Sequence, residues 1–223
     1  MLRGLTAASQ AMPRRGREPR AKLEESSPVG SLAALSSAIE ARDPYARGHS
    51  SRVTVFAQAM ARGLRLDKER ISVLRLGALL HDVGKLVVPS SVLLKRGPLS
   101  EEELGLMRRH PAAGARMLRS LGAPETILPL VLHHHERWDG AGYPTGRRGD
   151  DIPLEARVLC IADSFDAMTS TRPYRSSWTP DEALEELARC AGTQFDPDLV
   201  GAFASAWADA GLGVLVWQEA AAG

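Results

Sequence analysis

Residues 71–85 read ISVLRLGALLHDVGK, an apolar run that leads directly into a histidine, an aspartate and a lysine. The run predicts a helix that ends near Gly84. His81 and Asp82 then lie on neighbouring faces, so the imidazole can bind one metal ion while the carboxylate bridges to a second. Lys85 follows one turn later on the face of His81, where an ammonium can hold a phosphate. An ordinary helix end with a basic residue nearby is the alternative, and this stretch alone does not exclude it.

Helical periodicity continues along most of the chain. Asp67 is placed to cap the helix of residues 71–81, and the pairs Ser100/Glu103 and Thr179/Glu182 have the spacing of capping boxes. No segment shows the alternation of apolar and polar residues that is typical of a strand. The sequence therefore predicts an all-α fold, a bundle of about eight helices for a chain of this length.

Composition excludes several functional classes. The chain has 223 residues, of which 44% are hydrophobic and 25% charged, with a net charge of +1. That balance predicts a soluble globular protein without a bias toward a nucleic acid polymer or an acidic membrane. No apolar run reaches the roughly 18 residues of a membrane span, and no secretory signal is recognised. Cys160 and Cys190 lack zinc-ligand spacing, and both are expected to pack as small apolar residues in a reducing cytoplasm.

Three segments are expected. Residues 1–28 are basic and poor in apolar side chains, which predicts a disordered tail, either solvated or in contact with an acidic partner. Residues 29–205 form the folded domain, and 206–223 the end of the last helix and a tail. The apolar residues Val214–Trp217 either mediate a homodimer or pack back on the core, and the two are equally compatible with the sequence. No receiver, sensor or cyclase domain is recognised, so regulation is expected from the tail, an oligomer or another protein.

A long loop is expected at residues 137–146, which read RWDGAGYPTG. Its glycines and proline end any helix. Long ordered loops are often functional, and Trp138 and Tyr143 offer flat faces on which a base can stack. A surface loop packed by its own aromatic residues is the alternative.

Histidines and carboxylates form a candidate metal centre. Asp163 lies within an apolar helical segment at 155–170, where a carboxylate needs a cation, hydrogen bonds or a metal. Pro111 can kink the helix that carries the preceding histidine and turn it inward. Together with Asp82 and Asp163, five histidines supply nitrogen and oxygen ligands for two first-row transition metals, with iron, manganese or zinc favoured over calcium. All the histidines of the chain lie between positions 49 and 135, and five of them fall at expected turns or helix ends.

An ordered series of motifs resembles the HD-GYP family of the HD phosphohydrolase superfamily. The resemblance covers roughly residues 29–205 and is carried by DPYARGHS at 43–50, HDVGK at 81–85, HP at 110–111, HHE at 134–136, GYP at 142–144, ADSFDA at 162–167 and RPYR at 172–175. It implies hydrolysis of cyclic di-GMP to linear pGpG, with GMP as a further product, by a hydroxide that bridges two metal ions. It also implies a diguanylate cyclase or a sensor or receiver protein as partner, through the GYP loop.

The resemblance also implies a role for each site residue. His49, His81, Asp82 and Asp163 would hold one metal ion, and Asp82 would bridge to a second. Iron or manganese is the expected metal, with zinc, nickel or magnesium acquired in a preparation. The second ion would be held by His110, His134 and His135, and substrate phosphates by Lys85, Arg172 and Arg175. The loop at Gly142-Tyr143-Pro144 would shape the guanine groove or a partner surface. His133 falls outside the pattern.

Two positions depart from the family. Ala46 stands where threonine is common, and Tyr45 stands where some members have a glutamate ligand for a third metal ion, so a two-metal centre is expected. Two other functions remain compatible with the sequence. One is a phosphohydrolase for another nucleotide, such as a mixed cyclic dinucleotide, and the other is a non-catalytic module that recruits a partner through the Tyr143 loop.

Overall fold

The computed structural model describes residues 34, 35, 37–39, 41–43, 47–171 and 176–209. These residues form helices and loops and no strand, with one isolated bridge between Ala191 and Phe195, so the predicted all-α class is confirmed. The α-helices with described bounds are α2 (His49–Gly63), α3 (Lys68–Leu80), α4 (Ser90–Leu93), α5 (Glu101–Met107), α6 (His110–Ser120), α7 (Leu128–His133), α8 (Leu154–Thr169), α9 (Pro180–Arg189) and α10 (Pro197–Asp209). Short 3₁₀ helices are η2 (Val83–Val87), η3 (Glu125–Ile127) and η4 (Gly149–Asp151).

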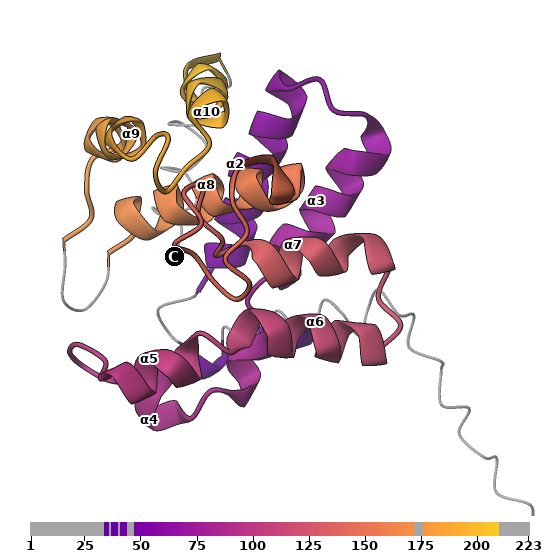
Figure 1. Ribbon diagram of the computed structural model, residues 1–223, viewed down its shortest axis with the longest axis vertical. Helices are drawn as coiled ribbons and strands as arrows, with labels where there is room; N and C mark the ends of the chain where they lie inside the picture. Colours follow the sequence, from indigo (N-terminus) through magenta and orange to yellow (C-terminus); the bar gives the residue numbers. More distant parts are fainter. Residues whose placement is uncertain (1–33, 36, 40, 44–46, 172–175, 210–223) are drawn as a thin grey trace, which may run out of the picture.

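The bundle has two apolar cores. Figure 1 shows the helices around them, with α9 and α10 at one end of the molecule and α4, α5 and α6 at the other. The larger lies among α2, α3, α8, α9 and α10, where the rings of Phe56, Phe165 and Phe203 pack edge to face with centroids 4.9–6.3 Å apart. The smaller lies among α3, η2, α6 and α7 and includes Leu118 and Val131, both fully buried. Helices α3 and α7 contribute to both cores, and their C-terminal ends meet between them.

Helix α3 begins as predicted and ends earlier than predicted. The Asp67 side chain accepts a hydrogen bond from the amide of Arg70 at 2.8 Å, as an N-cap does. The helix stops at Leu80, and His81 follows as its C-cap. Gly84 does not end it, and it lies within η2. Lys85 is therefore not one α-helical turn beyond His81 on a shared face, because the chain tightens into a 3₁₀ helix between them.

Gly84 has a different role from the one predicted. A Cβ atom at this position would lie 1.8 Å from the backbone oxygen of His110 and 2.6 Å from the amide nitrogen of Gly114. Glycine is therefore required because the backbone of η2 passes directly against α6. This close approach brings the HD pair next to His110.

Helices α5 and α6 form a break where the sequence predicted one kinked helix. The predicted capping box at Ser100 and Glu103 is present at the start of α5. That helix ends at Met107, and α6 begins at His110 with Pro111 in its first turn. The missing amide of a proline costs nothing in a first turn, so Pro111 starts a helix here and His110 is buried as expected.

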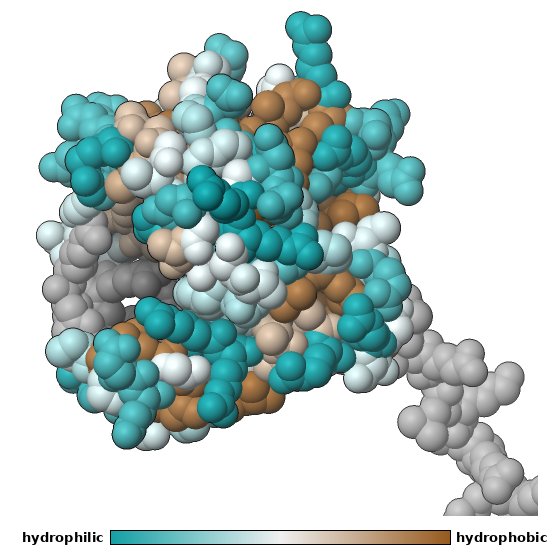
Figure 2. Space-filling view, viewed as in Figure 1, coloured by the Kyte–Doolittle hydropathy of each residue, from teal (hydrophilic) through white to brown (hydrophobic). Residues whose placement is uncertain are grey.

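The C-terminal helices follow their predicted caps. Thr179 and Glu182 form both hydrogen bonds of a capping box at the start of α9, and Pro180 is its first residue. No helix among the described residues is long and apolar enough to cross a membrane. Figure 2 shows a surface that is largely hydrophilic, with separate hydrophobic patches, among them one over α4 and α5 and one at the upper right near α2 and α3.

Candidate metal centre

The five predicted histidines converge at the ends of four helices. His49 is the first residue of α2, His81 follows α3, His110 is the first residue of α6, and His134 and His135 follow α7. The Nε2 atoms of His49 and His81 lie 3.3 Å apart, and those of His110 and His134 lie 3.2 Å apart. The structure therefore brings together residues that are up to 86 positions apart in the sequence.

Two groups of candidate ligands can be distinguished by their chemistry. We call His49, His81 and Asp163 the carboxylate half, and His110, His134 and His135 the imidazole half. Within each half, ligand atoms of all three residues lie within 4.8 Å of one another. A third group, which contains Asp82, connects the halves through His81 and His134.

Asp82 lies between the two halves. Its Oδ1 atom is 3.4 Å from Nε2 of His110, and its Oδ2 atom is 3.8 Å from Nε2 of His49. Asp82 is only 3% exposed, and Oδ1 has no hydrogen-bond partner among the described residues. A buried carboxylate oxygen without a donor is costly unless a cation binds it. The position and the unpaired oxygen of Asp82 fit a carboxylate shared by two metal ions.

Three imidazoles are oriented by backbone carbonyls three residues earlier. Nδ1 of His81 donates to the oxygen of Ala78 at 2.7 Å, and Nδ1 of His134 donates to that of Val131 at 2.8 Å. His110 donates in the same way to Met107, the last residue of α5, at 2.9 Å. The last carbonyls of a helix lack intrahelical partners, so a histidine just beyond the helix can use one. The proton is thereby held on Nδ1, and Nε2 is left to face a metal.

Asp163 projects from α8 toward the carboxylate half. Its Oδ1 atom lies 3.3 Å from Nε2 of His49 and 3.9 Å from Nε2 of His81. Burial raises the pKa of Asp163, but the hydrogen bond with His49 and the charges of nearby imidazoles lower it more, so the group stays ionised. The surrounding imidazoles therefore supply the hydrogen bond and the positive charge that a carboxylate in an apolar helix was expected to need.

The two halves differ in charge when no cation is bound. Burial lowers the pKa of His49, but hydrogen bonds with Asp163 and Asp166 outweigh this effect and raise the pKa to about 10. Burial lowers the pKa of His110 to about 4, against the opposing charge of Asp82. Burial also lowers the pKa of His134 and of His135. At neutral pH the imidazole half is therefore uncharged, whereas His49 carries a proton that a metal would displace.

Asp166 and Arg52 belong to the site and were missed from the sequence. Asp166 Oδ2 accepts from Nδ1 of His49 at 2.7 Å, and Nε of Arg52 donates to Asp166 Oδ1 at 2.6 Å. Asp166 is 1% exposed, and burial raises its pKa less than His49 and Arg52 lower it. The available signal was helical spacing, because Asp166 follows Asp163 by three residues and Arg52 follows His49 by three.

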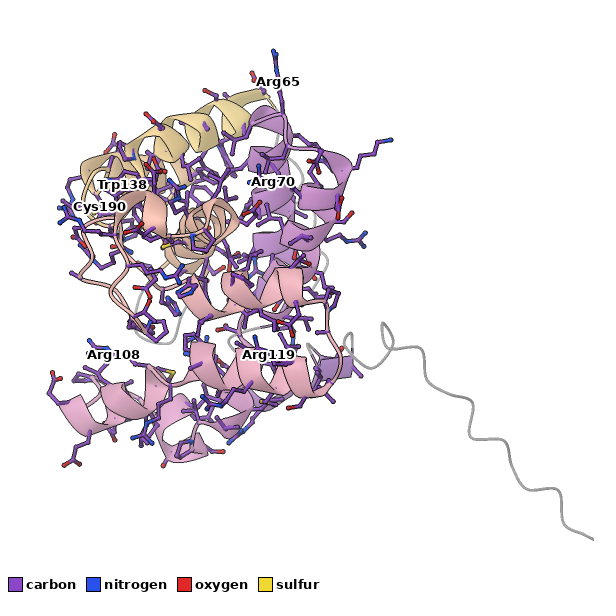
Figure 3. All side chains as sticks on the ribbon, turned by 45° about the vertical axis from the view of Figure 1, so that its right-hand side comes forward. Arg65, Arg70, Arg108, Arg119, Trp138 and Cys190 are labelled. Atoms are coloured by element: carbon purple, nitrogen blue, oxygen red, sulfur yellow. The ribbon has the colours of Figure 1, made fainter. Side chains whose placement is uncertain are left out.

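The Tyr143 loop packs directly on the imidazole half. A Cβ atom at Gly142 would lie 2.3 Å from the amide nitrogen of Arg137, so only glycine allows this approach. The amide of Tyr143 donates to the oxygen of His135 at 3.1 Å, and the two rings stack with centroids 4.9 Å apart. The guanidinium of Arg108 lies 5.7 Å from the centroid of the Tyr143 ring, at the edge of α5 (Figure 3). The loop therefore ties the tyrosine to a candidate ligand.

Trp138 stacks against an arginine of α8. The guanidinium of Arg157 lies 5.5 Å from the centroid of the Trp138 ring. Trp138 does not line the cleft that opens beside the candidate ligands. Lys85 lies beside Asp82, with its Nζ 2.6 Å from Asp82 Oδ2. The charge of Asp82 raises the pKa of Lys85 against the effect of burial, so the ammonium stays charged.

A cleft of about 320 Å³ opens beside the two halves. His135 and Asp163 form its floor, and residues of the Tyr143 loop, α8 and the segment before α10 form its walls. The lining residues are Arg108, His135, Glu136, Arg137, Ala141, Gly142, Tyr143, Cys160, Asp163, Ser164, Ala167 and Gln194. An acceptor-rich ligand suits this lining, because it offers two guanidinium groups and an amide next to the candidate ligands.

Several predicted residues lie outside the described part of the chain. These are Arg172 and Arg175 of the expected phosphate site, Tyr45 and Ala46, the basic tail of residues 1–28, and residues 214–217. His133, which the pattern excluded, lies outside the three ligand groups of the described residues, and its Nδ1 is 3.3 Å from Glu136 Oε1.

Residues 33–199 match the model of the HD domain family. The cyclic di-GMP phosphodiesterase response regulator RpfG of Xanthomonas campestris is 43% identical over 77% of this chain and 46% of its own length. The 3'3'-cGAMP-specific phosphodiesterase 3 of Vibrio cholerae is 39% identical over 78% of this chain and 38% of its own. This chain therefore spans less than half the length of these curated relatives.

A solved structure supports the fold. The crystal structure of a cyclic GMP-AMP specific phosphodiesterase of Vibrio cholerae superposes with a TM-score of 0.64 at 22% identity, and the match covers 82% of this chain and 49% of that one. At this level of identity the likeness shows a common arrangement of helices.

Proposed function

The chain belongs to the HD domain family, and from that premise we propose that it is a metal-dependent phosphodiesterase that hydrolyses cyclic di-GMP to pGpG, with GMP as a further product. The observation that carries the proposal is the buried Asp82, with an unpaired oxygen between two groups of histidine ligands. The names of relatives such as RpfG support the choice of substrate.

We assign two divalent metal ions, iron or manganese, to this centre. His49, His81 and Asp163 would hold one, His110, His134 and His135 the other, and Asp82 would bind both. The donor set contains nitrogen and oxygen and no thiolate, which suits these metals. When bound, the two ions would supply positive charge that activates water and offsets the charge developing on the phosphodiester.

The protein's own residues would position the substrate. Lys85 keeps an ammonium beside Asp82, where it can hold a phosphate oxygen, and Arg172 and Arg175 are proposed to act in the same way. Burial raises the pKa of Tyr143, so its phenol remains protonated and can donate one hydrogen bond in the cleft. In-line attack depends on such positioning and needs no covalent nucleophile.

A second substrate class is supported by one observation. Relatives named as 3'3'-cGAMP-specific match this chain nearly as well as those named for cyclic di-GMP. Hydrolysis of a mixed cyclic dinucleotide is therefore the alternative activity. Turnover of cyclic di-GMP, 3'3'-cGAMP and cyclic di-AMP by the same preparation separates the two.

The loop that carries Tyr143 is also proposed as the contact surface for a protein partner, such as a diguanylate cyclase or a sensor or receiver protein. Pro144 and Thr145 are exposed beside it, so the loop is accessible. A binding assay with purified candidate partners, repeated with the loop residue Pro144→Ala, tests this proposal.

Replacing His81 and Asp82 with alanine tests the activity. We expect cyclic di-GMP turnover to disappear while helical content, measured by circular dichroism, is retained. Arg119→Ala is a suitable control, because Arg119 lies on the far part of α6, exposed and paired only with Glu125 among the described residues (Figure 3). Unchanged turnover in the double variant would overturn the proposal.

A further inference from the structure

One wall of the cleft is built from two segments far apart in the sequence. The amide of Trp138 donates to the oxygen of Gln194 at 3.1 Å, and the amide of Asp139 donates to that of Thr193 at 2.8 Å. Figure 3 labels Trp138 and Cys190, one from each of these segments. The backbone bonds fix the segment after the HHE triplet against the turn between α9 and α10.

Gln194 lies on a well-ordered turn. Its backbone amide donates to the backbone oxygen of Cys190 at 3.0 Å, and the backbone amide of Gly192 donates to the backbone oxygen of Phe195 at 2.8 Å. Gly192 has a φ of 78°, a left-handed conformation that glycine adopts without strain. The position of Gln194 is therefore set before any ligand arrives, which lowers the entropy cost of binding.

Arg137 determines how the Gln194 amide is oriented. Two of its nitrogens donate to the Asp139 carboxylate, at 3.0 and 2.6 Å. Its Nη1 atom donates to Oε1 of Gln194 at 3.3 Å. A guanidinium has donors and no acceptor, so the oxygen of the glutamine must face it. No described residue accepts from the side-chain nitrogen of Gln194, so this nitrogen is the donor that the residue brings to the lining of the cleft.

We propose that Gln194, oriented by Arg137, is a specificity-determining residue that donates from its amide nitrogen to the O6/N7 edge of guanine. That edge of guanine carries acceptors only, whereas the matching edge of adenine pairs an acceptor with a donor. Glutamine recognises adenine by using its oxygen and its nitrogen together, and the oxygen of Gln194 is already engaged by Arg137. A donor at Gln194 therefore finds two acceptors on guanine, O6 and N7, but only N7 on adenine, which gives the cleft a preference for guanine.

This inference rests on the proposed function, because it takes a purine nucleotide as the occupant of the cleft. His135 and Asp163 line the same cleft as Arg137 and Gln194. A phosphodiester at the metal centre and a base against Gln194 can thus belong to one ligand. A phosphate oxygen is the other acceptor that this pair could bind, and it would give no preference between the bases.

Equilibrium binding of cyclic di-GMP and of cyclic di-AMP tests the proposal. Calorimetry on the full chain with its metal ions in place uses hydrolysis-resistant phosphorothioate forms of both nucleotides, so that binding is measured without turnover. Gln194→Glu keeps the shape and removes the donors, so the preference for cyclic di-GMP should fall by about tenfold or more. Arg137→Ala frees the oxygen of the Gln194 side chain to accept from adenine, so the affinity for cyclic di-AMP should rise relative to that for cyclic di-GMP. Arg147→Ala is the matched control, since Arg147 is exposed on the same loop and does not line the cleft.

Three results would contradict the proposal. In the first, Gln194→Glu weakens the affinity for both nucleotides equally, which indicates a contact with phosphate. In the second, neither variant changes the preference between the nucleotides, and in the third, the unsubstituted chain binds neither nucleotide. Turnover of bis(p-nitrophenyl) phosphate, which has no purine, reports the metal centre separately. If that turnover is absent while the base preference still changes, the proposed function fails and the role of Gln194 stands.

Discussion

The two halves of the metal centre place similar imidazoles in opposite electrostatic surroundings. In the carboxylate half, Asp163 and Asp166 flank His49 and hold its proton, with a pKa of about 10. In the imidazole half, three rings lie against one another, those of His110 and His134 are buried, and burial lowers the pKa of His110 to about 4. The same side chain is therefore charged in one half and neutral in the other, 3–4 Å from the shared Asp82. Their affinities for a cation should respond differently to pH and to substitution.

The largest effect is expected from the residue that both halves share. Asp82→Asn keeps the size of the side chain but removes the negative charge, and both halves lose a ligand. We expect cyclic di-GMP turnover to fall by about a thousandfold or more, since loss of a single electrostatic contact to a reacting group costs about 10²–10³. Metal content and turnover of the purified variant provide the measurement. Full metal binding by Asp82→Asn would mean that the halves are independent.

A smaller effect that is confined to one half is expected from Asp166→Asn. Asp166 orients His49 and is itself held by Arg52. Loss of such a supporting carboxylate lowers metal affinity by about 10–100-fold. The metal titration should show one weakened ion, while the ion of the imidazole half binds as before. Asp150→Asn serves as the control, because that side chain is 89% exposed. Equal weakening of both ions would contradict the division into halves.

The pH dependence separates the halves without a mutation. A metal must displace the proton of His49, so below a pKa of about 10 the affinity of the carboxylate half should rise about tenfold for each unit of increasing pH. The imidazole half is neutral above a pKa of about 4 for His110, so its affinity should be nearly flat between pH 6 and pH 8 on the basis of that value. Calorimetric metal titrations at several pH values report both. Parallel slopes for the two ions would show that His49 is not set apart from the other imidazoles.

The smallest effect is expected far from the centre. Thr179→Ala removes the capping box of α9 and should lower the free energy of unfolding by about 1 kcal/mol. Because α9 supplies no candidate ligand, both halves should bind metal as before. Denaturant unfolding and the metal titration are compared on the same preparation. A change in metal affinity here would indicate that the effects above report on overall stability.

Local chemistry made part of this structure predictable. Periodicity and capping boxes are local signals, and the starts of α3, α5 and α9 follow them. The convergence of five histidines and two aspartates was expected from their places at helix ends and from the family resemblance, and the fold brings these side chains together. The sequence indicated a separate role for Asp82 and for Lys85, but it did not predict the ion pair between them.

Contacts between distant segments were not predictable in the same way. The bond from Asp166 to His49 joins residues 117 positions apart, and the helical spacing of Asp166 from Asp163 does not identify His49 as its partner. Gly84 resembled a helix end, but its role is set by the backbone of α6, which only the fold brings close. Pro111 similarly marked a kink in the sequence, yet the chain uses it to begin a helix. Trp138 was expected to stack on a base or to pack within its own loop, and the contact of its ring with the distant Arg157 could not be read from the sequence.

Release of pGpG from cyclic di-GMP by the anaerobically purified chain tests the central claim most directly. Products are followed by chromatography on a sample of known metal content, before and after the metal is removed. We expect about two metal ions per chain, product before removal and none after it, with recovery when iron or manganese is restored. Two bound metal ions without any product, or product that persists after complete metal removal, would contradict a metal-dependent cyclic di-GMP phosphodiesterase.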